Sequence, residues 1–477
     1  MVIIFAAGIL AVLAAAGILV RAAACRSTEP GEAPTISSAP PTERAAGHLS
    51  EALQFQTVST EQNRQEFLDF AAWLEQTYPL VHSCLDLTTA AEFTRMYYWK
   101  GTEDTLKPVL LIAHQDVVAP GDPSRWSFPP FSGEQSGGFV WGRGALDMKG
   151  QLIALMEAAE WLLAQGFQPK QPIYLVLSHD EESRGDGAKA AAQYFRERGI
   201  TFDLLVDEGG LVSDQVVPGL SLPAATTGIA EKGYLDVRLT CTKPGGHSSM
   251  PERRTSLGIL AEVLTEIERR QFPLRMTPVA RLFFQAIRPH MRFSYRIVLT
   301  NLPVFSPLFL RYISRIPVGN AMVRTTTAVT MAAGSDAPNK LPPVSTAVVN
   351  FRMLHGDDEQ RVLEHVRSCI GSRPVTCEAV RSQPPSRVTD PESRGYQLVR
   401  RTIRQIFPEA VTAPYLMTGG TDARFYEDLA DALCRFSPYQ LSQHEINRMH
   451  AADERISYEN SERAVRFYLQ LLQNLQD

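Results

Sequence analysis

Three strongly apolar segments, separated by segments with helical character, constrain the fold of this chain more than any other feature. They read PVLLIAH from Pro108, PIYLVLSHDE from Pro172 and FDLLVDEGG from Phe202. A helix is predicted to begin near Met148, and AAQYFRERG predicts another between the second and third segments. Apolar strands that alternate with helices are typical of a mostly parallel sheet covered by helices on both faces. We therefore predict an α/β fold, with functional groups at the carboxyl ends of the strands.

The pattern changes after Lys232. The segments YLDVRLTCT and STAVVNFRML alternate in polarity, and SLGILAEVLTEIERR has helical periodicity. These features predict a smaller α+β lid domain at 233–380, inserted between two parts of a catalytic domain at 46–232 and 381–477. Within the lid, residues 281–317 are basic and aromatic. They are interpreted either as a buried helical excursion or as a surface that faces lipid or acyl chains.

The amino terminus has the composition of a membrane segment. Its first twenty residues are apolar and uncharged, and they end at Arg21. At about 1.5 Å per residue such a helix can cross a bilayer. Because no basic residues precede it, an uncleaved anchor over residues 1–25 is favoured, while cleavage near Cys25 and a buried helix stay open. Residues 26–45 are rich in Pro, Ser, Thr and Glu and predict a linker. The protein is thus expected to be membrane-anchored, or secreted and extracytoplasmic.

Charge and cysteine spacing exclude several classes of function. The formal net charge of −5 provides no basic field for nucleic acid. Six cysteines occur without a C-x-x-C pair, so neither a zinc ribbon nor a dense disulfide framework is indicated. A bridge between Cys369 and Cys377 is left open.

Acidic residues and histidines follow the apolar segments. His114 and Asp116 are two residues apart, so both side chains can point to one side of a strand, with Asp116 orienting the imidazole. Asp147 lies in a glycine-rich loop before the predicted helix, where it is either a helix cap or a ligand. Further acids stand in the run Asp180 to Glu182, and at Asp207 and Glu208; His450 lies in a polar segment near the carboxyl terminus.

Together these residues predict a metal site. Three successive parallel strands would deliver their acids and histidine to one edge of one sheet. Carboxylates mixed with imidazoles suit zinc. Two ions bridged by a carboxylate, for which Asp147 is the natural candidate, form a hydrolytic site. Of the adjacent carboxylates Glu181 and Glu182, one can bind metal while the other addresses a water.

At this point the sequence resembles the aminoacylase/carboxypeptidase family of co-catalytic zinc peptidases. It is most similar to the branch of carboxypeptidase S and the N-fatty-acyl-amino-acid synthase/hydrolases. The resemblance spans roughly residues 46–475 and rests on ordered motifs: LIAHQDVV, WGRGALDMKG, SHDEE, LLVDEGG, KPGGHSSMP, NAMVRTTTA, NKLPP, VNFRMLHGD, GGTDAR and MHAADE. The last motif departs from close relatives in lacking a Gly after the histidine.

The resemblance implies a role for each of these positions. It implies two zinc ions per chain, one held by His114, Asp147 and Asp207, the other by Asp147, Glu182 and His450. It makes Glu181 the general base, Asp116 the residue that orients His114, and His247 the oxyanion stabiliser, in cis or from the partner of a homodimer. It also implies a substrate-binding set: Arg352, Asn339, Gly420, Thr421 and Arg424.

The expected function is zinc-dependent hydrolysis of the amide bond in N-acyl amino acids, including fatty-acyl ones, or of the C-terminal bond in short peptides. A strict dipeptidase or carboxypeptidase is the alternative within this class. An inactive binding protein is the alternative outside it, and the presence of every expected ligand and of Glu181 argues against it.

Overall fold

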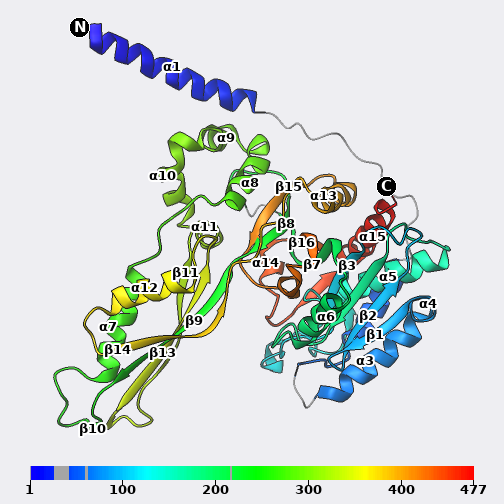
Figure 1. Cartoon of the computed structure of the whole chain (residues 1–477), viewed down its shortest axis with the longest axis horizontal. Coiled ribbons are helices and arrows are strands. Elements are labelled where there is room, and N and C mark those ends of the chain that lie inside the picture. The colour runs from blue at the N-terminus through cyan, green and yellow to red at the C-terminus, as the bar shows by residue number, and fades with distance from the viewer. Residues whose placement is uncertain (1, 26–41, 60–62, 215–216, 477) are drawn as a thin grey trace.

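The computed structural model describes residues 2–25, 42–59, 63–214 and 217–476 (Figure 1). The side chains of residues 2–12, 42 and 43 are outside this description. Two sheets organise the chain, one within the predicted catalytic segments and one within the predicted lid.

The larger sheet has eight strands in the order β1-β2-β6-β3-β7-β16-β8-β15. The four central strands β6, β3, β7 and β16 run parallel, whereas β1 and β2 pair antiparallel at one edge. The sheet is therefore mixed, with the predicted parallel centre. Its strands are β1 (Asp86–Ala90), β2 (Thr94–Trp99), β3 (Val109–His114), β6 (Ile173–Ser178), β7 (Phe202–Ser213), β8 (Ala224–Glu231), β15 (Val411–Met417) and β16 (Ala430–Leu441).

Helices cover both faces of this sheet, because the central strands are apolar on both sides. In β3, Val109, Leu111 and Ala113 pack into one core, while Leu110 and Ile112 pack into the other. The first core is closed by α2 (Thr42–Ala52), α3 (Arg64–Thr77), α4 (Pro79–Cys84), α5 (Lys149–Ala164), α13 (Arg394–Ile406) and α15 (Tyr458–Asn474). The second is closed by α6 (Asp186–Glu197) and η4 (Asp422–Tyr426).

The smaller sheet is antiparallel, in the order β11-β13-β9-β14. Alternate residues of β9 and β13 are buried against α7 and α12, which gives the sheet one covered and one open face. The strands are β9 (Gly233–Thr242), β11 (Thr326–Ala333), β13 (Val344–Met353) and β14 (Val375–Gln383), and the helices are α7 (Ser256–Arg269) and α12 (Glu359–Ile370). A short ladder of β10 (Gly246–His247) and β12 (Lys340–Leu341) forms the tip of this layer (Figure 1).

The basic and aromatic segment forms a helical group that packs on the larger sheet. Phe283 and Phe284 of its first helix share a core with Val411 and Ala413 of β15, the edge strand. Its later helices keep exposed apolar side chains. The group consists of α8 (Pro278–Ile287), η3 (Arg288–His290), α9 (Phe293–Thr300), α10 (Leu302–Ile313) and α11 (Pro317–Val323).

Short elements complete the described chain. A three-stranded sheet, β17-β5-β4, joins residues far apart in sequence. It consists of β4 (Glu134–Ser136), β5 (Phe139–Trp141) and β17 (Arg455–Ser457); η2 (Pro123–Arg125) and α14 (Gln443–Ile446) lie in neighbouring loops. All six cysteines are free, so the bridge left open between Cys369 and Cys377 is not formed.

The amino-terminal segment forms α1 (Val2–Ala24). Among the residues that the structure describes with side chains, no single helix is both long and apolar enough to cross a membrane. The predicted anchor at residues 1–25 lies partly outside these residues. One bent pair, α9 and α10, meets the length and composition criteria together, with an angle of 116° between its helices. Most of the predicted linker lies outside the described residues, and α2 already begins at Thr42.

Candidate metal centre

Four segments that are distant in sequence bring the predicted ligands to one edge of the larger sheet. His114 is the last residue of β3, and Asp147 lies two residues before α5. Glu182 lies in the turn between β6 and α6, and His450 in the loop between α14 and β17. Asp147 does not cap α5, whose N-cap position is Met148. Its carboxylate is instead shared between the two histidines.

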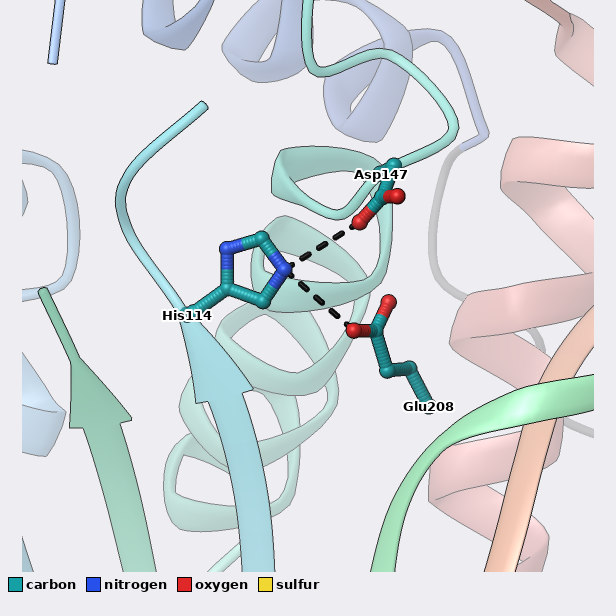
Figure 2. A group of neighbouring side chains, drawn as sticks. All are labelled: His114, Asp147 and Glu208. Carbon is teal, nitrogen blue, oxygen red and sulfur yellow. Dashed lines mark hydrogen bonds and ion pairs between the residues drawn. The ribbon is translucent and has the colours of Figure 1, made fainter. Parts of the chain in front are cut away.

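The first cluster consists of His114, Asp147 and Glu208 (Figure 2). His114 Nε2 lies 3.1 Å from Asp147 Oδ1 and 3.4 Å from Glu208 Oε1. In Figure 2 both carboxylates point toward the same imidazole nitrogen. Three such ligand atoms facing one point form a cation-binding arrangement.

The second cluster consists of Asp147, Glu182 and His450. His450 Nε2 lies 2.9 Å from Asp147 Oδ2 and 3.1 Å from Glu182 Oε1. Asp147 therefore presents one oxygen to each cluster, which is the geometry of a bridging carboxylate.

The structure brings Glu208, and not the predicted Asp207, to His114. The ladder of β7 and β16 pairs Asp207 with Arg435 and next pairs Gly210 with Phe436, so Glu208 and Gly209 form a bulge. A bulge redirects the side chains beside it. Asp207 Oδ2 accepts a hydrogen bond from the backbone N–H of Ala423 at 2.7 Å instead. Sequence reasoning therefore missed Glu208, because the pattern LLVDEGG does not reveal the bulge.

Asp116 contacts several of the segments around the first cluster. It is fully buried, and its Oδ1 lies 3.3 Å from His114 Nδ1. The same carboxylate accepts hydrogen bonds from the backbone N–H groups of Glu181 and Glu182, each at 3.2 Å. Asp180, the first acid of that run, accepts hydrogen bonds from the first turn of α6. Glu182 belongs to the second cluster, and the carboxylate of Glu181 lies close enough to His114 and Glu208 to interact electrostatically with them.

The electrostatics of the edge favour a bound cation. Burial lowers the pKa of His114, but the carboxylates of Glu208 and its neighbours more than offset this and raise it well above the usual range. Burial, together with Asp147, raises the pKa of Glu208 well above its usual value. Burial and Asp422 do the same for Glu181. Clustered buried carboxylates are costly without a compensating positive charge. The donor set of carboxylates and imidazoles therefore fits metal ions of the zinc type.

One further residue holds the site together and was not predicted. Glu454 is fully buried and forms an ion pair with Arg143. Its Oε1 accepts hydrogen bonds from the backbone N–H groups of Gly144, Leu146 and Asp147, at 3.1, 2.8 and 3.2 Å. Since Glu454 follows His450 by four residues, it ties the loop of one ligand to the loop of the bridging ligand. Its place in MHAADE was the only sequence signal.

A basic pocket contains most of the predicted substrate-binding residues. Arg352, Arg424 and Gly420 line a cavity of about 30 Å³, together with Arg381 and Lys232. Within the described residues, none of these three arginines forms a salt bridge. Thr421 is adjacent and donates to Glu231, which also lines the cavity, at 2.9 Å. The space suits a small anionic group.

The remaining predicted residues, His247 and Asn339, lie together at the tip of the smaller sheet. The backbone N–H of Ser248 donates to Asn339 O at 3.0 Å, and both predicted side chains are exposed. Figure 1 shows this tip away from the larger sheet. Within the described part of one chain, the structure does not bring His247 or Asn339 to the metal-ligand clusters.

A family model and several known proteins match most of this chain. The family model described as Peptidase family M20/M25/M40 matches residues 110–474. Probable carboxypeptidase S-like 2 of Dictyostelium discoideum is 37% identical over 439 residues, covering 90% of this chain and 84% of the relative. The human N-fatty-acyl-amino acid synthase/hydrolase is 34% identical over 435 residues, covering 89% and 86%.

Solved structures support the fold. The M20 family metallo-carboxypeptidase Sso-CP2 from Sulfolobus solfataricus matches with a TM-score of 0.66 at 17% identity, covering 91% of this chain and 99% of its own. Human carnosine dipeptidase 1 matches with a TM-score of 0.64 at 15% identity, covering 91% and 96%. At this identity the two structures show that the architecture is shared.

Proposed function

Because this chain belongs to peptidase family M20/M25/M40, and is thus a hydrolase of a metal-dependent family, we propose that it uses two zinc ions to hydrolyse an amide bond next to a free carboxylate. The substrates are N-acyl amino acids, including fatty-acyl ones, or the C-terminal bonds of short peptides. The observation that carries this proposal is the pair of clusters that share Asp147.

The residues of the two clusters are those that would hold the metal ions. His114, Asp147 and Glu208 face one position, and Asp147, Glu182 and His450 face the other. When bound, two divalent ions that share a carboxylate lower the pKa of a water between them and polarise the scissile carbonyl. Asp116 holds the imidazole of His114 in place through its Nδ1.

Glu181 is the proposed general base. Its pKa is raised by burial and by Asp422, so its carboxylate readily takes up a proton from the attacking water. It then passes this proton to the departing amine, which must leave as a neutral group. We assign oxyanion stabilisation to His247 and binding of the substrate to Asn339. Because both lie on an exposed tip, they reach the site by closure of the smaller sheet or from the partner in a homodimer.

The basic pocket sets the proposed substrate class. Arg352 and Arg424 have planar guanidinium groups that can grip the free carboxylate of the substrate. Two relatives are named for carboxypeptidase S-like and N-fatty-acyl-amino-acid chemistry, and both chemistries leave an amino acid with a free carboxylate. A strict dipeptidase or carboxypeptidase is the alternative.

A substrate panel with the zinc-loaded protein tests the proposal. N-oleoyl-phenylalanine, its carboxamide counterpart and a set of dipeptides are compared by product release. We expect hydrolysis of the free acid and a large loss with the carboxamide. Activity on dipeptides alone would favour the alternative, whereas equal rates with acid and carboxamide would contradict the role of the basic pocket. Full activity after chelation would contradict the metal mechanism.

The variant Glu181→Gln tests the base separately. It retains the size of the side chain but cannot accept the proton. We expect turnover to be abolished while two zinc ions per chain remain, because Glu181 belongs to neither cluster. An active variant would reject the assigned base.

A further inference from the structure

An apolar stripe crosses the outer side of the helical group that packs on β15. Val304, Leu308 and Tyr312 of α10 are 64%, 67% and 46% exposed. Their spacing of four residues places them on one face of the helix. Phe293, at the start of α9, is also exposed. We call these four residues the insertion face.

The insertion face borders a hollow between the two helices. This hollow has a volume of about 470 Å³ and is lined mainly by aromatic and aliphatic side chains, including Tyr295, Val298 and Phe305. Because α9 and α10 meet at 116°, the pair forms a bent wedge and not a simple helical hairpin. A wedge of this kind exposes apolar surface that water solvates poorly.

The charged residues of the segment that carries the insertion face have one sign. No acidic residue occurs between Glu268 and Asp336, although the whole chain has a net charge of −5. The arginines of this stretch are Arg269, Arg270, Arg275, Arg281, Arg288, Arg292, Arg296, Arg311, Arg315 and Arg324. Arg292, Arg311 and Arg315 are exposed beside the apolar stripe. Apolar side chains flanked by arginines match the chemistry of an anionic membrane surface.

The amino-terminal helix extends the same surface. Asn301, between α9 and α10, donates through Nδ2 to the backbone oxygen of Ile18 in α1, at 3.2 Å. The next residues of α1, Leu19, Val20 and Arg21, are exposed. Apolar and basic groups therefore continue from α10 onto the end of α1.

We propose that the insertion face docks on a membrane surface that contains anionic lipids. The apolar side chains of α9 and α10 enter the boundary between headgroups and acyl chains, and the flanking arginines bind lipid phosphates. The acidic remainder of the molecule is repelled by the same surface, which fixes the orientation. Docking holds the hydrolase where amphipathic substrates concentrate. The docking proposal is independent of the proposed substrate class, and either one can fail without the other.

Vesicle flotation of the full chain tests docking. We compare phosphatidylcholine vesicles with vesicles that also contain phosphatidylglycerol. The double variant Arg311→Gln/Arg315→Gln should lower partition onto the anionic vesicles roughly thirty-fold, because each basic residue near such a surface contributes about a factor of five. Val304→Asp/Leu308→Asp should weaken it at least as much. Leu68→Asp, on the exposed side of α3, is the matched control and should bind normally.

All these variants retain α1, which could bind vesicles by itself. A fluorescence measurement at single positions therefore tests whether the insertion face itself enters the membrane. Leu308→Trp should be quenched by brominated lipids, and Leu68→Trp should not. The proposal is overturned by wild-type partition of Val304→Asp/Leu308→Asp, by equal quenching of the two tryptophans, or by binding that ignores lipid charge. If Val304→Asp/Leu308→Asp abolished self-association of the chain but left vesicle binding unchanged, the insertion face would bind a second copy of the chain. That result would also overturn the proposal. Circular dichroism confirms that the variants are folded.

Discussion

Replacing Glu454 by Gln tests how the bridging carboxylate is held. The amide preserves the size of the side chain and can still accept the N–H groups of Gly144, Leu146 and Asp147. It removes the negative charge that faces the buried guanidinium of Arg143. The variant therefore isolates the electrostatic part of the contact from its shape.

The structure indicates the size of the effect. Breaking a buried ion pair by removing one partner costs about 3–5 kcal/mol. Burial raises the pKa of Glu454 even though Arg143 opposes the shift, so desolvation already offsets much of the pairing energy in the wild-type protein. We therefore expect the lower end, a loss of about 3 kcal/mol in the free energy of unfolding. Because Asp147 moves with its loop, zinc affinity should fall roughly 10- to 100-fold, as it does for residues that position metal ligands.

Urea unfolding of the metal-free protein and chelator competition for zinc measure the two effects. Glu459→Gln is the control: it lies in the same carboxyl-terminal region and pairs with Arg463 on the surface, so it should cost less than about 1 kcal/mol and leave zinc binding unchanged. If Glu454→Gln matched this control in both assays, the reasoning would be refuted.

Three further predictions concern the site and its surroundings. Glu208→Gln should reduce zinc, measured by plasma mass spectrometry, from two ions toward one per chain, whereas Asp207→Asn should retain both; the reverse would show that bound metal recruits Asp207. Mixed Glu181→Gln and His247→Ala chains should recover roughly a quarter of wild-type activity if a symmetric dimer supplies the histidine in trans, and no recovery would place it in cis. Burial lowers the pKa of Lys232 to about 7, so the unfolded chain binds the extra proton between about pH 7 and 10 and stability rises with pH there. Lys232→Met should lower the slope of unfolding free energy against pH by up to about 1.4 kcal/mol per pH unit, as measured by thermal unfolding. An unchanged slope would contradict the lowered pKa of Lys232.

The sequence predicted most of the fold that positions the site. The segments ending in His114 and Ser178 are strands of the parallel centre, as their continuous apolar character indicated. The alternating segments formed the antiparallel sheet with one covered face. Local periodicity was sufficient here because each element buries the side chains that its own pattern marks as apolar.

Features that depend on contacts between distant segments were not predictable. The choice of Glu208 over Asp207 depends on a bulge opposite Arg435 and Phe436, which are more than two hundred residues away in sequence. The role of Glu454 depends on a loop around Asp147. The helical group at 278–323 was assigned to the lid, yet its first helix is buried against β15 of the larger sheet.

The strand order has a consequence for how the protein is made. β16, at Ala430–Leu441, lies between β7 and β8 and is parallel to the former. While the ribosome synthesises the chain, the edge of β7 that pairs with β16 stays open until nearly all residues have emerged, although its other edge can already pair with β3. The nascent chain must therefore keep an open strand edge from aggregating during synthesis. Closure of the sheet is a late and slow event, since it joins strands far apart in sequence, and chains that stop short of β16 should depend on chaperones or be degraded.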